Sequence, residues 1–374
     1  MEIIISMFIS ASYATLMLWL LYGIFKLKTF HLTEETQKAS FSICIPFRDE
    51  AENLPQLLIS LEAIDYSTEL FEIIFINDGS GDDSVKIVEE FIQQHPQLYM
   101  LLLHNSAKAI SPKKEALSKA IQHSSKEYLV TTDADCEVPK KWLLYFNAMI
   151  IQQKSEFIAG PVSYISSGSF LDKFQTLDFL SLQAATLGGF GNKEAFLCNG
   201  ANLCYKKDSF LEVNGFDNDK IASGDDIFLL EKMQLNKKKI NYLSNVEACV
   251  KTLPPQTFKA LLKQRIRWAS KTSAYKNKTS LLTAVIVFLA NLFFLIFFFG
   301  AIFQLLAWQA FILLLILKLN LDFFILYKTA EFYEQPHLMK SYIPIAFLHP
   351  LFIVNSAFLS ILKSYEWKGR NFKK

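Results

Sequence analysis

The sequence predicts an α/β protein in which a mostly parallel, Rossmann-like sheet with helices is joined to transmembrane helices at both ends of the chain. Four short apolar runs in the first half alternate with amphipathic stretches, and strands that alternate with helices are typical of parallel sheets with right-handed crossovers. The chain is also unusually apolar, with 51% hydrophobic residues and 34 Phe among 374 residues. This excess is concentrated at the two ends, which indicates membrane-spanning segments there.

The N-terminal segment is an uninterrupted apolar stretch, Ile3–Phe25. At 1.5 Å per residue it is long enough to cross the hydrocarbon core of a bilayer, which is about 30 Å thick. A cleaved signal peptide is the alternative, but the residues before the stretch include Glu2 and no Lys or Arg. Lys26 and Lys28 follow it, so the positive-inside rule places the next segment in the cytoplasm. We therefore expect residues 1–28 to be a transmembrane anchor.

The predicted parallel sheet begins with four strands. They are expected at Phe41–Pro46, Glu72–Asn77, Leu98–Leu103 and Tyr128–Thr132. Helices are expected at Glu50–Glu62 and Asp83–Ile92, where apolar residues recur at helical spacing. Polar residues follow each of the four strands, and ligands bind parallel sheets at the carboxyl ends of the strands. We therefore expect the binding site at this edge of the sheet.

Two carboxylates, Asp133 and Asp135, come directly after the fourth apolar run. Residues i and i+2 of an extended segment point to the same side, so the two side chains can converge just past the end of the strand. Such hard oxygen ligands suit Mg²⁺ or Mn²⁺ carrying a diphosphate, because these ions keep open positions for phosphate oxygens. The alternative is an ordinary polar turn after a strand.

Charge and cysteine content narrow the function classes. The formal net charge is +2, so nothing indicates a nucleic-acid partner. The five Cys are scattered along the chain and form no C-x-x-C pair. This pattern favours reduced thiols in a cytosol-facing domain over a disulfide framework or a zinc site.

The C-terminal third carries the remaining membrane segments. A basic amphipathic stretch, Thr257–Lys278, is typical of a helix at a membrane surface. Apolar segments follow at Leu281–Phe303, Leu306–Leu326 and Tyr342–Leu362. The second contains Lys318, Asn320 and Asp322, so it either spans the membrane or is partly re-entrant. The basic tail should stay cytoplasmic. Three spans that start inside end outside, so one segment does not cross or one boundary is misplaced.

Four motifs occur in order along the chain. Ile43–Glu50 closes the first predicted strand, Asn77–Asp82 closes the second, and Asp133–Asp135 closes the fourth, followed later by Gly224-Asp225-Asp226. Gln264-Arg265-Ile266-Arg267-Trp268 lies in the basic stretch. Together these motifs resemble the membrane-integrated, Q-x-x-R-W type of the family 2 glycosyltransferases, which includes processive polysaccharide synthases and enzymes that form glycolipids. The resemblance implies a GT-A fold and the inverting transfer of a sugar from a nucleotide diphosphate donor.

The resemblance completes the expected domain plan. The segments are a transmembrane anchor at 1–28, a cytoplasmic GT-A domain at 40–255, an interfacial helix with the Q-x-x-R-W motif at 256–280, transmembrane helices at 281–363 and a basic cytoplasmic tail at 364–374.

On the donor side, the resemblance assigns roles to the edge of the sheet. Asp135 is expected to ligate Mg²⁺ or Mn²⁺, with Asp133 beside it near the nucleotide sugar, and the metal neutralises the departing diphosphate as a Lewis acid. The residues expected to bind the nucleotide are Pro46, Arg48, Glu50, Asp78, Lys113 and Asp133.

Two positions on this side depart from the family pattern. Asn77 stands where members usually carry Asp, so the nucleoside contact is assigned to Asp78, and helix capping by Ser80 or Asp82 is the alternative role of this turn. Pro112 stands where members carry a Gly, just before Lys113, which matches the Lys of the family pattern. The alternative for Lys113 is an ordinary solvent-exposed side chain without a role in binding.

On the acceptor side, the resemblance makes Asp226 the base that takes the proton of the attacking hydroxyl, and Asp225 tunes it. An ordinary acidic pair at a helix start is the alternative. Gln264, Arg267 and Trp268 match the signature and are counted with the catalytic residues. Arg267 suits the diphosphate and Trp268 offers a flat apolar face to the acceptor. A merely interfacial Arg and Trp are the alternative.

The predicted function is a membrane-bound inverting glycosyltransferase that moves a sugar from UDP-GlcNAc or UDP-Glc to a lipid-linked acceptor. The modest C-terminal membrane region and the ending Glu366–Arg370, which looks like the tails of lipid-directed members, favour a lipid acceptor. A processive polysaccharide synthase is the alternative, ahead of a nucleotidyltransferase or a non-catalytic scaffold. The expected partners are the nucleotide-sugar donor, a lipid or glycan acceptor and membrane lipids. The expected location is the inner cell membrane, crossed several times, with the catalytic domain in the cytoplasm.

Overall fold

The computed structural model describes residues 1–33, 36, 38–105, 111–165, 168–216, 224–362, 365–367 and 370–372. The last two ranges are described by their backbone alone, so the rest of the predicted tail at 364–374, including the side chains of Glu366–Arg370, lies outside the described residues. The chain divides into two compact units. The α/β unit consists of Lys28–Ile165 and Cys198–Leu253, and the helical unit consists of Met1–Leu27, Ser166–Leu197 and Pro254–Lys374.

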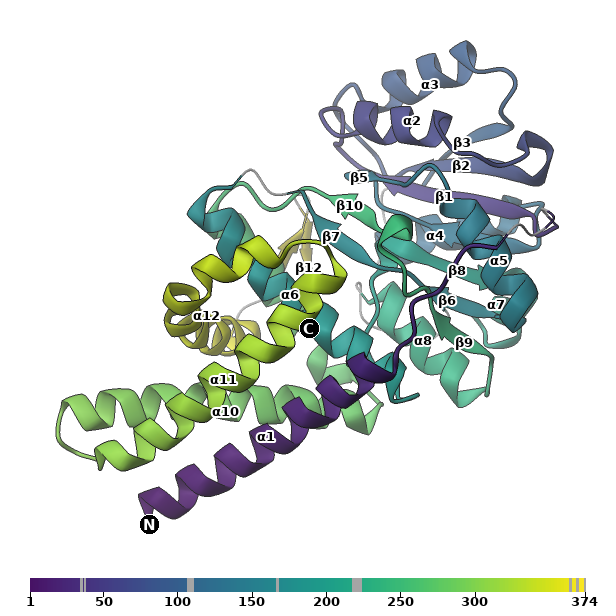
Figure 1. Cartoon of the computed structure of the whole chain (residues 1–374). Coiled ribbons are helices and arrows are strands. Elements are labelled where there is room, and N and C mark those ends of the chain that lie inside the picture. The colour runs from purple at the N-terminus through teal and green to yellow at the C-terminus, as the bar shows by residue number, and fades with distance from the viewer. Residues whose placement is uncertain are drawn as a thin grey trace. The chain divides into compact units, whose positions relative to one another are not determined.

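The α/β unit is built on a 7-stranded sheet with the strand order β3-β2-β1-β4-β8-β6-β9 (Figure 1). The strands are β1 Phe41–Phe47, β2 Phe71–Asn77, β3 Met100–His104, β4 Tyr128–Thr131, β6 Phe157–Ala159, β8 Leu203–Lys206 and β9 Ile240–Tyr242. Phe41 of β1 is in parallel register with Phe71 and Tyr128 on its two neighbours, whereas β8 is antiparallel to β4 and β6. The mostly parallel sheet confirms the predicted fold class.

Helices and a second, small sheet complete the α/β unit. The helices are α2 Leu54–Glu62, α3 Ser84–Gln94, α4 Pro112–His123, α5 Trp142–Gln153, α7 Lys207–Glu212 and α8 Asp225–Leu235, and the 3-10 segments are η1 Thr68–Leu70, η2 Gly200–Asn202 and η3 Val246–Ala248. The small sheet has the order β5-β10-β7, formed by Cys136–Glu137, Val250–Thr252 and Val162–Tyr164. Every residue of β2 is buried, as expected for a parallel strand covered on both faces, and this explains its continuous apolar run.

The loop after β1 differs from the prediction, because α2 begins at Leu54 instead of Glu50. Two backbone N–H groups at the expected helix start are used elsewhere. The N–H of Glu50 donates to Oγ of Ser84 at 2.8 Å, and that of Ala51 donates to Oδ2 of Asp82 at 2.9 Å. These bonds join the loop after β1 to the loop after β2, so the residues stay at the edge of the sheet.

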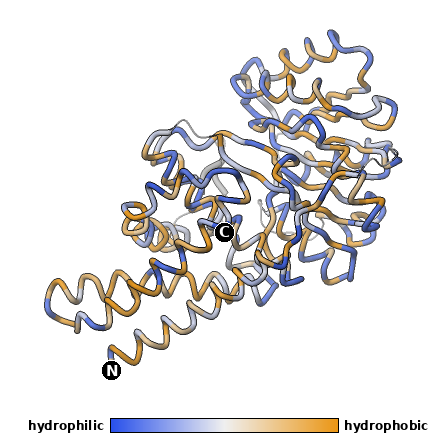
Figure 2. The backbone as a smooth tube through the Cα atoms, in the orientation of Figure 1, coloured by the Kyte–Doolittle hydropathy of each residue, from blue (hydrophilic) through white to orange (hydrophobic). Residues whose placement is uncertain are grey.

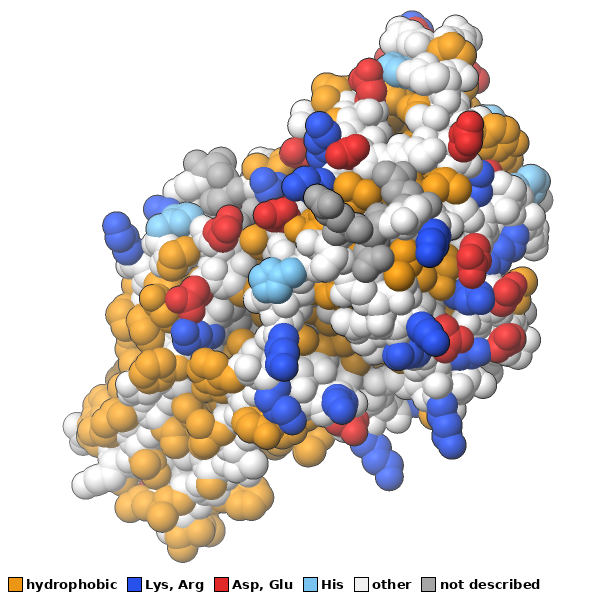
Figure 3. Space-filling view, turned by 45° about the vertical axis from the view of Figure 1, so that its right-hand side comes forward, with side chains coloured by type: hydrophobic (Ala, Val, Ile, Leu, Met, Phe, Trp, Pro, Cys, Tyr) orange, Lys and Arg blue, Asp and Glu red, His pale blue; other side chains and the backbone are white. Residues whose placement is uncertain are grey.

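The helical unit contains the predicted membrane segments. Its elements are α1 Glu2–Lys26, α6 Phe170–Gly191, α9 Phe258–Ala269, η4 Thr272–Ala274, α10 Lys278–Ile302, α11 Trp308–Phe332, η5 Pro336–Ser341, α12 Tyr342–Leu362 and the strands β11 Tyr365–Trp367 and β12 Arg370–Phe372. Within the part of the chain that the structure describes, four helical segments are long and apolar enough to cross a membrane, namely α1, α10, α11 and Pro336–Leu362. Figure 2 shows that hydrophobic residues predominate along these helices, and Figure 3 shows hydrophobic side chains gathered on the surface over them.

The basic stretch forms a shorter helix than expected, since α9 ends at Ala269 and not at Lys278. The side chain of Asn277 accepts hydrogen bonds from the backbone of Thr279 and Ser280, and so begins α10 as a separate helix. The interfacial and spanning parts of this region are therefore separate helices.

Close backbone contact joins α1 to α6 through glycines. A Cβ on Gly23 would lie 2.0 Å from the carbonyl oxygen of Gly188, and a Cβ on Gly191 would lie 1.8 Å from that of Gly23. A side chain at either position would clash with backbone, so only glycine fits there. The contact is reinforced by Asn192, whose Nδ2 donates to the carbonyl of Trp19 at 2.7 Å.

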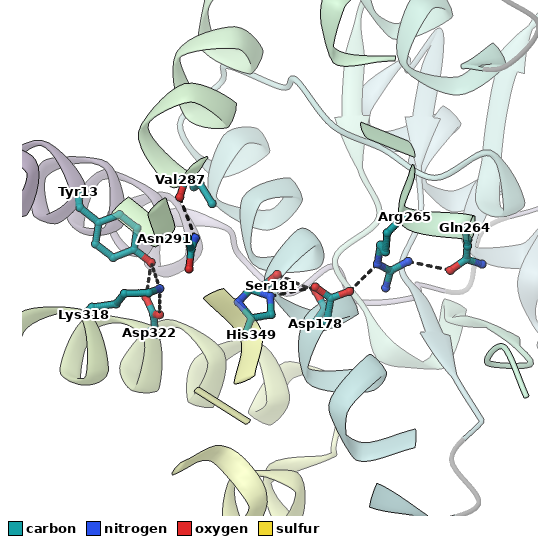
Figure 4. A network of polar contacts seen from close by, with 10 residues as sticks. All are labelled: Tyr13, Asp178, Ser181, Gln264, Arg265, Val287, Asn291, Lys318, Asp322 and His349. Carbon is teal, nitrogen blue, oxygen red and sulfur yellow. Dashed lines mark hydrogen bonds and ion pairs between the residues drawn. The ribbon is translucent and has the colours of Figure 1, made fainter. Parts of the chain in front are cut away.

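Two of the polar residues that interrupt α11, Lys318 and Asp322, are partnered (Figure 4). Nζ of Lys318 lies 2.5 Å from Oδ2 of Asp322 and 3.2 Å from the hydroxyl of Tyr13 on α1. Tyr13 also donates to Asp322. Lys318 is 4% exposed, so its charge lies against α1, as is usual for ionisable groups in membrane segments. α11 is one continuous helix of 25 residues, which is long and apolar enough to cross a membrane.

Candidate active site

Two loops at the carboxyl edge of the sheet are tied together where β1 and β2 end. Asp49 has a left-handed backbone with φ of 50°. Its N–H donates to Oγ of Ser80 at 3.1 Å, and its Oδ1 accepts from the N–H of Gly81 at 2.8 Å. Oδ1 of Asp82 accepts from the N–H of Ser84 at 3.1 Å, where α3 begins. The cap position of α3 is Asp83, which makes no side-chain cap hydrogen bond, so neither Ser80 nor Asp82 is the capping residue. The side chain of Asp82 instead holds the first N–H of α3, and Ser80 holds the neighbouring loop.

The predicted nucleotide-binding residues Arg48 and Asp78 lie together at this edge. Nη1 of Arg48 donates to the backbone oxygen of Asp78 at 3.2 Å and lies 3.9 Å from its carboxylate. Nδ2 of Asn105 donates to Oδ1 of Asp78 at 3.0 Å. Pro46 lies within β1, and Glu50 lies in the tied loop. The carboxylate of Asp78 is therefore buried, charge-compensated and fixed in direction.

Asn77 has a local structural role at the end of β2. Its Oδ1 accepts from the N–H of Ser80 at 2.8 Å, and its Nδ2 lies 3.2 Å from Nδ1 of His104 on β3. Its side chain therefore joins the loop after β2 to the end of β3.

Segments far apart in the sequence meet around Lys113, the second residue of α4. Its Nζ lies 2.7 Å from Oδ1 of Asp133, just after β4, and 3.3 Å from Oδ2 of Asp225, the first residue of α8. The N–H of Gly200 donates to Oδ2 of Asp226 at 3.3 Å. The structure thus brings two residues expected on the donor side, Lys113 and Asp133, together with the expected base, Asp226.

The backbone at Gly200 fits closely against this cluster. A Cβ there would lie 3.2 Å from Oδ2 of Asp225 and 3.6 Å from Cβ of Asp226, so a side chain would press on the carboxylates. Oγ1 of Thr131 donates to the carbonyl of Gly200 at 2.8 Å. The second oxygen of Asp226, Oδ1, accepts from the N–H of Ile227 at 2.8 Å. Both oxygens of Asp226 are therefore oriented by backbone donors.

Opposing influences act on the pKa of Lys113. Burial lowers this pKa, but Asp133 and Asp225, with a smaller share from Asp226, outweigh burial and raise the pKa above its ordinary value. The ammonium group therefore stays charged at neutral pH. It supplies the counter-charge that allows three carboxylates to lie close together.

Replacing Lys113 by Met is expected to lower the melting temperature by several degrees at pH 7. The change keeps the length of the side chain and leaves Asp133 and Asp225 without this counter-charge. Breaking a fully buried pair costs about 3–5 kcal/mol, and because the side chain of Lys113 is 22% exposed we expect about 1–3 kcal/mol. The control is Lys86→Met on α3, whose pair with Glu90 is solvent-exposed. A melting curve that is equally shifted in both variants would contradict the role of Lys113.

The donor set at Asp135 fits a divalent ion completed by substrate. Among the residues that the structure describes, no group of three or more His, Cys, Asp and Glu side chains is arranged to hold a metal ion. A Mg²⁺ ion that binds nucleotide phosphates needs only one or two protein carboxylates. Asp133 and Asp135 are both half-buried, and the carboxylate of Asp133 is paired with Lys113.

The Q-x-x-R-W residues lie on α9, in the helical unit. The ring of Trp268 packs on Phe179 of α6 with 6.2 Å between the ring centroids. Cζ of Arg265 lies 4.2 Å from the Trp268 ring centroid, and Nη1 of Arg265 donates to Oε1 of Gln264 at 2.8 Å. Arg267 is half-buried. Two of the three signature side chains thus contact Arg265, a residue between them that the sequence did not single out.

A buried charge network behind α9 was also missed from the sequence. Nε of Arg265 lies 2.5 Å from Oδ2 of Asp178 on α6, and Nε2 of His349 on α12 lies 3.0 Å from Oδ1 (Figure 4). Burial raises the pKa of Asp178, but Arg265 and His349 outweigh it and lower the pKa to about 2. The sequence did carry one signal, since Asp178 is a carboxylate placed directly between two apolar residues, Leu177 and Phe179.

The chain matches two family descriptions. "Glycosyl transferase family 2" matches residues 42–213, and "Glycosyl transferase family group 2" matches residues 128–326, which is more than half of the chain. The first match covers the loops after β1 and β2 and the pair Asp133 and Asp135. The second adds Asp225, Asp226 and α9.

Curated relatives include enzymes that make a polysaccharide. The chain is 29% identical over 243 residues to a poly-β-1,6-N-acetyl-D-glucosamine synthase of Staphylococcus epidermidis, which covers 63% of this chain and 55% of that protein. It is 30% identical over 230 residues to the enzyme of the same name from Staphylococcus aureus strain COL, covering 59% and 52%. The chain thus spans about half the length of the curated relatives it matches.

A solved structure shares the fold over nearly the whole chain. The mannosyltransferase PcManGT from Pyrobaculum calidifontis, in complex with GDP-Man and Mn²⁺, superposes with a TM-score of 0.60 over 96% of this chain and 99% of that one, at 16% identity. At this identity the likeness shows the fold, which agrees with the predicted GT-A architecture. With the family matches over both units, the chain belongs to the family 2 glycosyltransferases.

Proposed function

We propose that this enzyme is a membrane-bound inverting glycosyltransferase that moves N-acetylglucosamine from UDP-GlcNAc to a lipid-linked acceptor. The observation that carries the proposal is the cluster in which Lys113 bridges Asp133 and Asp225 beside the backbone-oriented carboxylate of Asp226. The choice of sugar is supported by the relatives that are named for an N-acetylglucosamine polymer. UDP-Glc is the second donor to be tested.

Asp226 is the base of the proposed reaction. Its carboxylate accepts the proton of the acceptor hydroxyl while that oxygen forms the bond to the anomeric carbon and the bond to the diphosphate breaks, which inverts the configuration. The N–H groups of Gly200 and Ile227 hold the two oxygens of Asp226 in direction. Lys113 supplies the charge opposite to that of Asp225, beside Asp226.

The donor is held by the edge of the sheet. Arg48 and Asp78 contact the nucleoside from the loops after β1 and β2, and Asp133 lies against the donor sugar. Asp135 holds Mg²⁺ or Mn²⁺, which supplies Lewis-acid neutralisation of the departing diphosphate. The pairing of Asp133 with Lys113 supports this division of roles between the two carboxylates.

The helical unit serves the acceptor and the membrane. In this proposal Gln264 and Trp268 contact the acceptor, and Arg267 pairs with the diphosphate through its planar guanidinium. The apolar helical segments cross the inner cell membrane several times, and Lys26 and Lys28 after α1 support a cytoplasmic α/β unit by the positive-inside rule. The expected boundaries, 40–255 for the catalytic domain and 256–280 for the interfacial helix, belong to the same proposal.

A processive polysaccharide synthase is the second candidate, and the polymer-forming relatives favour it. Both candidates use the same donor and the same base, so they differ only in whether the product stays bound and is extended. The size of the product therefore separates them.

The test is to incubate the purified full chain in lipid nanodiscs with Mn²⁺, lipid extract and radiolabelled UDP-GlcNAc, UDP-Glc or GDP-Man in parallel. We expect UDP-GlcNAc to give UDP and a single labelled product that partitions into organic solvent. A ladder of water-soluble sugars would establish the processive alternative. Release of pyrophosphate instead of UDP would contradict sugar transfer by this site.

A further inference from the structure

We propose that Asp178 and His349 are positioning residues of the transfer reaction, which act through Arg265 to hold Gln264 and Trp268 in the orientation that the acceptor requires. The inference rests on the proposed function, because it takes these two signature side chains to act on substrate. It adds residues from α6 and α12 that lie outside the signature itself.

The network joins three helices that are far apart in the sequence (Figure 4). Asp178 on α6 has one oxygen 2.5 Å from Nε of Arg265 on α9 and the other 3.0 Å from Nε2 of His349 on α12. The backbone oxygen of Asp178 accepts from Oγ of Ser181 at 2.7 Å. Both carboxylate oxygens are therefore committed, and the side chain has a single direction.

The guanidinium of Arg265 connects Asp178 to two signature residues, Gln264 and Trp268. While Nε of Arg265 faces Asp178, Nη1 donates to Gln264 at 2.8 Å, and the face of the group lies 4.2 Å from the ring centroid of Trp268. A guanidinium is planar and rigid, so fixing one edge fixes the other edge and the face. The indole of Trp268 also packs against the ring of Phe179, which helps to hold it in place.

A contribution to protein stability does not by itself explain the buried ion pair of Asp178 and Arg265. The side chains of Asp178 and Arg265 are 3% and 6% exposed, and a buried ion pair is often no more stabilising than apolar residues of the same volume. What the pair supplies is a fixed geometry, which apolar packing supplies less well. A misplacement of about 1 Å in a reacting group can cost about 100-fold in rate.

The main test compares Asp178→Asn with Asp172→Asn in the full chain in nanodiscs. Asp172 is a matched control, because it is also buried on α6 and accepts from Gln175 at 3.0 Å outside the network. We expect Asp178→Asn to lower kcat/KM for the acceptor by about 10–100-fold while the Kd for UDP-GlcNAc with Mn²⁺ stays within about 2-fold. The control should match the parent in both measurements.

A second readout follows Trp268 directly, without relying on activity. Acrylamide quenching assigned to Trp268, as the difference between each protein and its Trp268→Phe counterpart, should increase in Asp178→Asn and not in Asp172→Asn. If the parent transfers no sugar, the proposed function fails, yet increased quenching would still support the positioning of the indole. Unchanged quenching together with unchanged transfer overturns the inference.

If Asp178→Asn does not fold, the inference is tested by comparing His349→Gln with His349→Phe. Gln keeps an N–H donor for Asp178 and Phe removes it, although both fill much of the same volume. We expect His349→Gln to keep acceptor kcat/KM within about 3-fold of the parent and His349→Phe to lower it by about 10-fold or more. Equal effects of the two substitutions would overturn the inference.

Discussion

Asp226→Asn is expected to bind the nucleotide-sugar donor as the parent does and to transfer sugar about 10²–10⁴-fold more slowly, the range that general-base catalysis contributes. Asparagine keeps the shape of the side chain, and its single oxygen can still accept from the N–H of Gly200 or of Ile227, which bond different oxygens of Asp226. It cannot take a proton from the acceptor hydroxyl. The loss should therefore appear in kcat, with the Kd for donor unchanged in calorimetry.

An acidic residue at an ordinary helix start provides the control for this experiment. Asp208 lies in the first turn of α7 in the same unit, as Asp226 does in α8. If Asp226 served only the helix dipole, Asp226→Asn and Asp208→Asn would have similar small effects. Full transfer activity in Asp226→Asn would refute the proposed mechanism.

Asp135→Asn is expected to abolish metal-dependent donor binding. Replacing this carboxylate removes the main protein ligand that we propose for Mg²⁺ or Mn²⁺, so we expect at least about 10–100-fold weaker binding of Mn²⁺ in the presence of UDP. Chelation of the metal in the parent should have the same effect on donor binding. The measurement is titration of Mn²⁺ followed by electron paramagnetic resonance, which does not depend on turnover.

Asp133→Asn distinguishes the two carboxylates of this pair. Because Lys113 engages the carboxylate of Asp133, we expect this variant to lose less Mn²⁺ affinity than Asp135→Asn and to fall mainly in transfer rate. If Asp135→Asn binds Mn²⁺ and UDP as tightly as the parent, the assignment of the metal to Asp135 is wrong.

Local sequence pattern was enough to predict the framework of the site. The strands β1, β2 and β4 are short apolar runs bounded by polar residues, and the edge of a parallel sheet follows from their order. The predictions at Arg48, Asp78 and Asp133 relied on this rule, and the structure places these residues after β1, β2 and β4. The start of α2 was misjudged because helical spacing is visible in a sequence. The hydrogen bonds that the N–H groups of Glu50 and Ala51 donate to Ser84 and Asp82 are not visible there.

Contacts between distant residues explain what the sequence did not reveal. Lys113 was expected near the donor, but nothing in its neighbourhood indicated that it would bridge Asp133 and Asp225. Arg265 and Asp178 are 87 positions apart, and His349 and Asp178 are 171 apart. The family signature drew attention to Arg267 and Trp268 instead, since a signature selects positions by residue type and not by the partners that hold them.

The hydroxyl that α1 contributes to Lys318 and Asp322 has a consequence for handling this enzyme. Tyr13 lies 305 residues before Lys318, so this contact can form only after α11 has been synthesised. Replacing α1 by an unrelated apolar helix would leave the Lys318–Asp322 ion pair without the phenol of Tyr13. Expression designs that exchange or remove α1 therefore remove a polar contact that joins it to α11.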